Sequence, residues 1–239
     1  MNIQINKLLI FPIIFALASC GGGGGGGGDS DSGYSEQNSW HFATGSAGQT
    51  NARLSAKSLL EQGCDCLISW GVAGALDPQL TVGDLIVTSA VINDRSESFK
   101  FDSDDLKSLV ETFRSLDPKV GGLLYSAEKP VPLAIEKQEL REKFRAESVD
   151  MESAAIAKVA CDAKINFIAV RCIVDRSDYD LPVAATSSFK NNGEVNVFQL
   201  IKELTQNPLQ LFSLMRLGLN YYSALRQLKK AAALLQRCL

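Results

Sequence analysis

Histidine and clustered positive charge are what this sequence has least of. Only His41 occurs in 239 residues, so a histidine-rich metal site or a histidine-based acid/base scheme cannot be assembled, and carboxylates must carry any acid/base chemistry. Lys and Arg total 24 against 27 Asp and Glu, and no basic tract gathers them on one segment. We therefore expect no metal, no bound cofactor and no nucleic-acid partner.

The cysteines are too few and too widely spaced for a disulfide scaffold. None of the six forms a C-x-x-C pair, so we expect most of them to be core thiols. With 46% apolar and 21% charged residues, the composition is that of a globular protein with one sizeable core. The six are Cys20, Cys64, Cys66, Cys161, Cys172 and Cys238.

The amino-terminal residues are typical of a lipoprotein signal. Lys7 precedes an apolar run, residues 8–18, that is too short to span a bilayer, and small residues lead up to Cys20. We predict a lipoprotein-type signal over residues 1–20, a Gly/Ser/Asp-rich linker over 21–40, and membrane anchoring through a lipidated Cys20. A second interpretation stays open: residues 8–17 form a degenerate first core strand, and the chain is cytoplasmic, where reduced buried thiols are at home.

Strand-like and helix-like segments alternate over residues 41–239. This alternation predicts one α/β domain, a three-layer α/β/α sandwich with a mixed, mostly parallel central sheet. Strands are expected at 41–44, 66–70, 84–92, 120–126 and 166–174, and helices at 52–60, 103–116, 134–145, 150–162, 197–204 and 209–235. The apolar side of the last helix consists of Leu211, Leu214, Met215, Leu217, Leu225 and Leu228.

Two strand ends carry the residues of chemical interest. The strand at 66–70 runs into small residues, 71–78, which form either a tight turn or a place where the backbone approaches a ligand. The strand at 166–174 ends at Asp175, which either caps a loop or faces a ligand, because ligands of α/β sheets bind beyond such carboxyl ends. Arg171, inside that apolar strand, needs a partner: an incoming anion, a positioned water, or a carboxylate such as Glu152.

Three sequence blocks together resemble the superfamily of purine nucleoside phosphorylases and methylthioadenosine/adenosylhomocysteine nucleosidases. The blocks are SWGVAGALDP (69–78) with VGD (82–84), VDMESAA (149–155) and VRCIVD (170–175). Within the superfamily, the sequence most resembles the hopanoid-associated phosphorylases. The resemblance lies in the S-x-G-x-A-G and V-D-M-E-S motifs, the D-x-x-D-x-x-L-P-x-A-A stretch at 175–185 and the tail at 208–228. The resemblance implies a nucleoside phosphorylase-like fold.

The resemblance also implies roles for individual residues. Asp175 would protonate or hydrogen-bond N7 of a departing purine, with Arg171 beside it as the second catalytic residue. Glu152 would accept hydrogen bonds from the ribose hydroxyls, and Met151 would pack beside the sugar. Substrate would approach the backbone closely at the small residues Ala73 and Gly74. Dipole compensation at a helix start is the plain alternative for Glu152.

The sequence departs from the resemblance at its beginning. Nucleosidases of this superfamily place a water-activating glutamate after a glycine-rich first strand, whereas no acidic residue here precedes Asp29, and Val72 stands where many have serine. A phosphorylase needs no such base but needs a cradle for phosphate as co-substrate, for which residues 45–48 and Arg171 are the candidates.

Two functions follow from these residues. The first is cleavage of the N-ribosidic bond of a nucleoside or adenosyl lipid, releasing adenine from adenosylhopane in hopanoid biosynthesis. The second is a catalytically impaired, lipid-anchored protein that binds nucleosides. The family's habit also implies a homo-oligomer.

Overall fold

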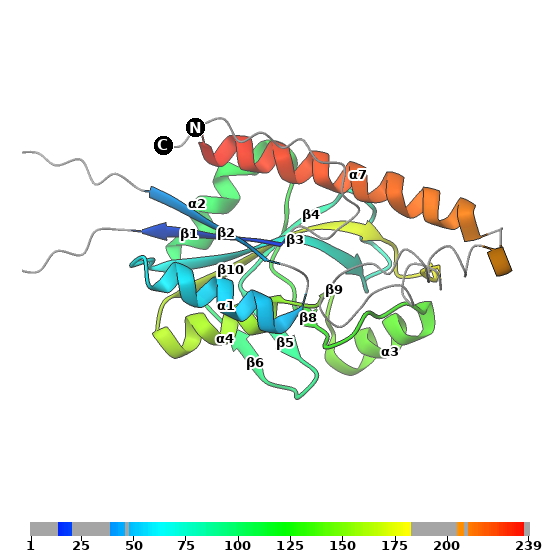
Figure 1. Ribbon diagram of the computed structural model, residues 1–239, viewed down its shortest axis with the longest axis horizontal. Coiled ribbons are helices and arrows are strands. Elements are labelled where there is room, and N and C mark those ends of the chain that lie inside the picture. The colour runs from blue at the N-terminus through cyan, green and yellow to red at the C-terminus, as the bar shows by residue number, and fades with distance from the viewer. Residues whose placement is uncertain (1–13, 21–38, 46–47, 183–204, 208–209, 237–239) are drawn as a thin grey trace, which may run out of the picture.

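The computed structural model describes residues 14–20, 39–45, 48–182, 205–207 and 210–236, which form a ten-stranded mixed sheet with helices on both faces (Figure 1). The helix predicted at 197–204 lies outside these residues. The sheet order is β6-β5-β8-β9-β3-β10-β4-β7, and β1 pairs with β2 and β3.

The helices and strands have the following bounds. The strands are β1 (Ile14–Cys20), β2 (Ser39–Gly45), β3 (Cys66–Ala75), β4 (Leu85–Thr88), β5 (Ala90–Asn93), β6 (Ser98–Lys100), β7 (Lys119–Val120), β8 (Leu124–Ser126), β9 (Ser148–Asp150) and β10 (Asn166–Asp175). The helices are α1 (Gln49–Leu60), α2 (Asp104–Thr112), the short 3-10 helix η1 (Arg114–Leu116), α3 (Ala134–Phe144), α4 (Ser153–Ala163) and α7 (Gln210–Leu235).

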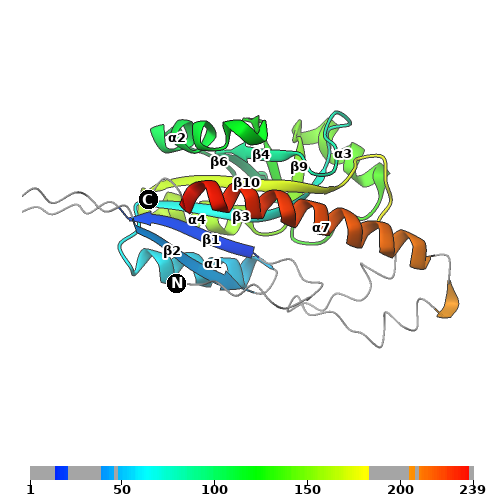
Figure 2. The same ribbon diagram turned by 90° about the horizontal axis from the view of Figure 1, so that it is seen from above.

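The three predicted layers are confirmed by how β3 and β10 alternate. One side of these strands packs with α1 and α4, through residues such as Leu67, Phe167 and Ala169. The other side packs with α2 and α7, through residues such as Ile68 and Val170. Both faces of the sheet are therefore covered, which explains why the two strands are nearly continuous apolar runs (Figure 2).

The sheet is mixed, as predicted, but less parallel than predicted. The central pair β3 and β10 is parallel, as are β4 with β7, β5 with β8, and β8 with β9. The pairings of β1 with β2 and β3, β10 with β4, β3 with β9, and β5 with β6 are antiparallel. Parallel and antiparallel pairings are thus distributed across the sheet, and the parallel pair β3 and β10 brings its carboxyl ends to the same edge.

Three strand predictions are wrong in where the strands end or divide. Residues 71–75 continue β3 instead of forming a tight turn, because they pair with β10 and β9. The run predicted at 84–92 is divided into β4 and β5, which pair with different neighbours. The run at 120–126 is likewise divided into β7 and β8.

The amino-terminal strand β1 lies in the stretch for which the sequence allowed two interpretations. Its backbone pairs antiparallel with β2 from Ile14 to Cys20 and with β3 from Phe15 to Ser19. Cleavage before Cys20 would take most of this strand out of the sheet, so the two interpretations differ in a measurable way. No helix within the described residues combines the length and the apolar content that a membrane crossing requires.

Helix α7 buries only part of its predicted apolar side. Its second half packs on the sheet through Ala224, Leu228, Ala231 and Leu235. Leu211 and Met215, predicted to face inward, are exposed. The reason is that the first half of the helix extends past the ends of the strands, as both ribbon views show.

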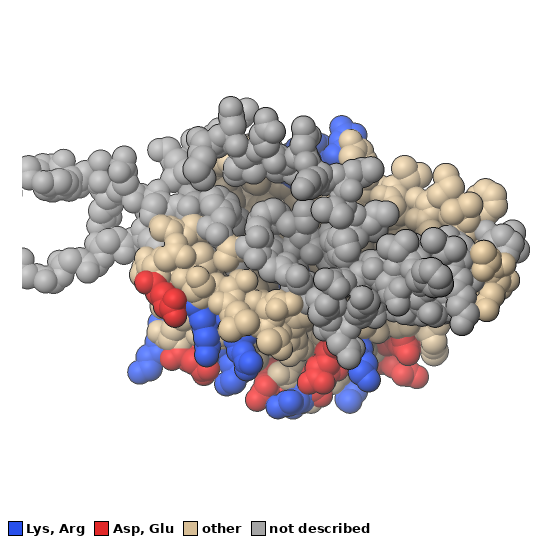
Figure 3. Space-filling model, in the orientation of Figure 1, with Lys and Arg blue, Asp and Glu red and all other residues tan. Residues whose placement is uncertain are grey.

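Three of the described cysteines are buried in the core, and charged side chains of both signs lie on the surface. Cys64, Cys66 and Cys172 are buried, as predicted for core thiols, whereas Cys161 is exposed on α4. Burial raises the pKa of Cys172 to about 12, so this thiol stays protonated at neutral pH. On the face shown in Figure 3, side chains of both charge signs are interspersed along the α1 and α4 side.

Candidate active site

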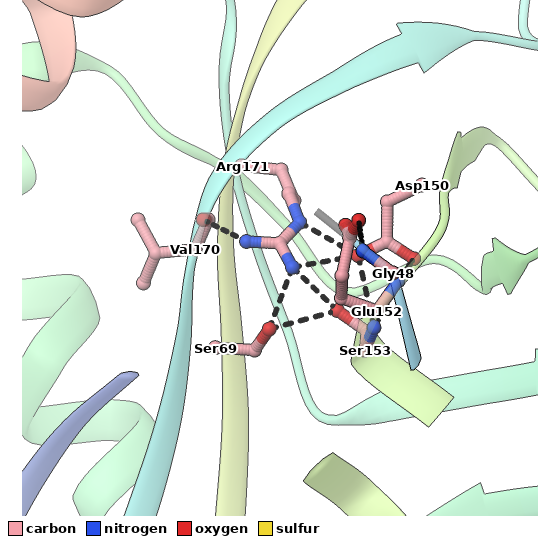
Figure 4. Close-up of polar contacts among 7 residues, drawn as sticks. All are labelled: Gly48, Ser69, Asp150, Glu152, Ser153, Val170 and Arg171. Atoms are coloured by element: carbon pink, nitrogen blue, oxygen red, sulfur yellow. Dashed lines mark hydrogen bonds and ion pairs between the residues drawn. The ribbon is translucent and has the colours of Figure 1, made fainter. Parts of the chain in front are cut away.

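Arg171 lies in the middle of β10 and is fully buried beside a carboxylate. Its Nε and Nη2 donate to Oδ2 of Asp150, at 2.9 and 2.6 Å (Figure 4). Its Nη1 donates to the carbonyl oxygen of Val170 at 3.2 Å. Asp150 comes from the end of β9, which runs alongside β3, so the pair joins the central strands to their neighbour.

Two serines complete the hydrogen bonding of Arg171. Its Nη2 donates to the hydroxyls of Ser69, at 2.6 Å, and Ser153, at 2.8 Å. The partner of Arg171 is therefore Asp150, where the sequence had offered Glu152 as the carboxylate. With no exposed surface and with protein partners on every nitrogen, Arg171 supports the site and has no direct path to a ligand.

Glu152 precedes α4 and its carboxylate is buried against the backbone of a distant loop. The amide N–H of Gly48, which follows β2, donates to Oε1 of Glu152 at 3.0 Å. Burial raises the pKa of Glu152 to about 7, helped by the charge of Asp150 and opposed by Arg171 and by amide hydrogen bonds. A buried carboxyl that exchanges a proton near neutral pH is suited to bind hydroxyl groups as acceptor or donor.

Asp175 ends β10 and is paired with a lysine. Its side chain is buried, and its Oδ2 accepts a hydrogen bond from Nζ of Lys137 at 2.5 Å. Lys137 is fully buried and also donates to the carbonyl oxygens of Arg176 and Tyr179, each at 2.9 Å. Desolvation raises the pKa of Asp175, while the Lys137 charge and hydrogen bond act in the opposite direction.

Gly74 makes room for the Asp175 carboxylate. The register of β10 on β3 shifts between Ile173 and Asp175, so that Asp175 lies opposite Gly74. A Cβ atom built on Gly74 would lie 3.2 Å from both carboxylate oxygens and from Cγ1 of Val149. The sequence predicted that substrate approaches the backbone at Gly74, whereas the group that approaches it in the structure is the Asp175 carboxylate from the neighbouring strand.

The other predicted site residues are close along the chain but differ in setting. Ala73 is buried in an apolar cluster with Ile173 and Ile86, and it lies opposite Ile173 in the pairing of β3 with β10, so its side chain belongs to the core. Met151 is half-buried between Asp150 and Glu152.

Lys137 is the functional candidate that sequence reasoning missed. It lies in α3, a helix of mostly exposed residues, and is the one buried residue of that helix. Lysine at such a position is ordinarily a solvated side chain, so the pattern offered no signal. The segment before α3 is also tied to the segment after β10. The carbonyl oxygen of Pro132 accepts a hydrogen bond from the amide of Leu181.

The layers and the buried carboxylates near the sheet's central strands define an α/β protein of the nucleoside phosphorylase type. A family model described as "Phosphorylase superfamily" matches residues 34–206, which is most of the chain. The chain therefore belongs to the Phosphorylase superfamily, and the resemblance seen in its sequence blocks is confirmed at that level.

Two bacterial nucleosidases are among the relatives that the chain matches. The chain is 26% identical over 148 residues to the 5′-methylthioadenosine/S-adenosylhomocysteine nucleosidase of Staphylococcus epidermidis, covering 54% of this chain and 64% of that protein. It is 28% identical over 149 residues to the aminodeoxyfutalosine nucleosidase of Campylobacter jejuni, covering 54% of this chain and 65% of that protein. The chain thus spans just under two thirds of the length of these curated relatives.

A solved structure shows the same fold. The 5′-methylthioadenosine/S-adenosylhomocysteine nucleosidase of Colwellia psychrerythraea, in complex with adenine, matches with a TM-score of 0.55 and 21% identity. The match covers 71% of this chain and 79% of that one. The predicted α/β fold class is therefore confirmed.

Proposed function

We propose that this chain cleaves the N-ribosidic bond of an adenine nucleoside and releases the base. The observation that carries the proposal is Asp175, a buried carboxyl at the carboxyl end of β10. Breaking the bond leaves an oxocarbenium-like sugar and puts negative charge on the departing base, so a proton supplied to the base lowers the barrier. The similarity to adenine-nucleoside nucleosidases supports the same substrate class.

Glu152 suits the sugar side of this reaction. Its carboxylate is held by the amide of Gly48, and it is close enough to Asp150 and Arg171 for their charges to shift its pKa. We propose that it receives the ribose hydroxyls and that Met151 packs beside the ring. The Arg171 network would then act by fixing the segment that carries both residues.

The charges around the site favour water as the attacking group. The amide of Gly48 is bonded to Glu152, and the guanidinium of Arg171 is bonded to Asp150. Gly48, the last residue of the candidate cradle at 45–48, and Arg171 are thus committed to carboxylates, which would also repel an incoming phosphate dianion. We therefore propose hydrolysis in place of phosphorolysis.

The finer substrate assignment is an adenosyl lipid, with adenosylhopane as the specific proposal. It is supported by the sequence motifs that resemble those of hopanoid-associated phosphorylases. The predicted lipid anchor at Cys20 also supports it, because the anchor would hold the protein beside such a substrate. Metabolic labelling with a radioactive fatty acid tests the anchor: label is expected in the wild type and absent in Cys20→Ser. Size measurement of the purified protein tests the proposed homo-oligomer.

A second function is favoured by one observation, the absence of any acidic residue before Asp29. Without a water-activating carboxylate in that region, the chain would bind nucleosides without turnover. Full-length protein should be incubated with adenosylhopane, methylthioadenosine and inosine, with and without phosphate, and free base followed by chromatography. Base release that Asp175→Asn abolishes supports the enzyme, whereas ligand binding without release supports the binding protein.

A further inference from the structure

Lys137 occupies a position that a purely structural lysine would avoid. It lies in the first turn of α3, where the helix dipole disfavours a cation, and its side chain has no exposed surface. Burying an ion pair seldom stabilises a fold more than apolar residues of the same size would. The pair with Asp175 therefore calls for an explanation beyond stability.

In the pair of Lys137 and Asp175, one carboxylate oxygen faces the lysine, and the other has no hydrogen-bond partner among the described residues. Nζ of Lys137 is bonded to Oδ2 of Asp175, and no hydrogen bond joins Oδ1 to any described residue. The two backbone carbonyls that accept from Nζ hold the ammonium in place without neutralising it. Asp175 can thus accept a proton on one side and present the other side to a base.

We propose that Lys137 stores the proton that Asp175 delivers to the departing base. This inference rests on the proposed function. In the free protein the pair is an ammonium and a carboxylate. As the C–N bond breaks, its electron pair moves to the base, Asp175 gives a proton to a base nitrogen, and Lys137 passes its own proton to Asp175 and becomes a neutral amine. The attacking water adds its oxygen to the sugar carbon, and the proton it loses restores the ammonium.

The charged groups around the pair are engaged elsewhere. On α3, Arg141 is bonded to Asp77, 2.6 Å away, and Glu136 accepts from the amide that begins the helix. After β10, Arg176 and Asp178 bind each other, and Asp180 accepts from the amide of Ala134. Burial raises the pKa of Asp175, and Lys137 is the only charged group among the described residues that shifts it.

The test is the pH profile of kcat/KM for adenine release by full-length protein and its Lys137→Met variant. If Lys137 stores the proton, the variant loses about 10²-fold or more at neutral pH. It recovers toward acid pH, where Asp175 carries its own proton. Lys143→Met, an exposed lysine of the same helix, should match the wild type. A loss that is equal at all pH values means that Lys137 only ties α3 to the segment after β10, and it overturns the inference.

A second measurement keeps the inference testable if Lys137→Met does not fold. The infrared difference between wild type and Asp175→Asn reports the protonation of Asp175. A carboxylate signal at neutral pH is expected, and a protonated carboxyl signal there overturns the stored proton on Lys137. If the wild type releases no base from any adenosyl compound, the proposed function itself fails, whereas release with an unaltered profile in Lys137→Met rejects the lysine alone.

Discussion

The two buried ion pairs of β10, four residues apart, differ in the kind of cation they contain. Arg171 pairs with Asp150 through two of its nitrogens, and the hydroxyls of two serines accept further hydrogen bonds from its Nη2. A guanidinium does not release its proton in a protein, so this pair is a fixed charge arrangement. Lys137 is an amine that can release a proton, and its partner Asp175 ends the strand. One pair therefore serves as framework, and the other is suited to chemistry.

Asp175→Asn should separate the two pairs most strongly. The amide cannot deliver a proton, so we expect adenine release to fall by about 10²–10⁴-fold. Ligand binding, measured by thermal shift with methylthioadenosine, should survive. Equal loss of binding and turnover would indicate that Asp175 holds the fold of the site instead of serving its chemistry.

Arg171→Met should have the opposite signature, a large loss of stability. Removing the cation leaves Asp150 buried without its partner, which costs about 3–5 kcal/mol in the free energy of unfolding. Urea denaturation measures this cost. Arg176→Met is the matched control, because its pair with Asp178 is exposed and is worth about 0–1 kcal/mol. Similar values for both variants would contradict the framework role of Arg171.

Glu152 links the framework pair to pH. Its folded pKa, about 7, is above its ordinary 4.5, so the folded state holds this proton more tightly than the unfolded state does. The resulting stabilisation is complete below about pH 4.5 and is lost as the pH rises to about 7, on the order of 3 kcal/mol. Glu152→Gln should remove this slope in urea denaturation between about pH 5 and 8. Parallel curves for the two proteins would show that burial does not raise this pKa.

Gly74→Ala should disturb the Asp175 pair alone. The added methyl group would crowd both carboxylate oxygens, and overpacking of this kind costs about 1–3 kcal/mol. Adenine release should fall further than this loss of stability explains. Gly218→Ala in α7 is the control: nothing lies within 4 Å of its added Cβ, and the change should stabilise the helix by about 0.5–1 kcal/mol.

The sequence predicted the elements whose patterns are local and strong. The apolar run of β10, the start of β3 and the helices α3 and α4 lie close to their predicted positions, and Asp175 was found because it ends such a run. Pairing partners are a tertiary property, so the division of 84–92 into β4 and β5 was not visible. The exposure of Leu211 has the same origin, since the helix outlasts the sheet it packs on.

The two buried cations, Arg171 and Lys137, show most clearly what the sequence cannot predict. Arg171 was conspicuous because it interrupts an apolar strand, yet the sequence left its partner open, and the carboxylate that pairs with it is Asp150, two positions before the example Glu152. Lys137 lies among polar residues of a helix, where burial leaves no mark on the sequence.

Arg171 also has a consequence for how β10 finds its place. Its neighbours Val170 and Cys172 face the cluster formed with α2 and α7, which is wholly apolar. A slip of one residue would turn the guanidinium into that cluster, away from Asp150, at a cost of several kcal/mol for an unpaired buried charge. Arg171 therefore favours a single register of β10 in the sheet, and this register places Asp175 correctly during folding.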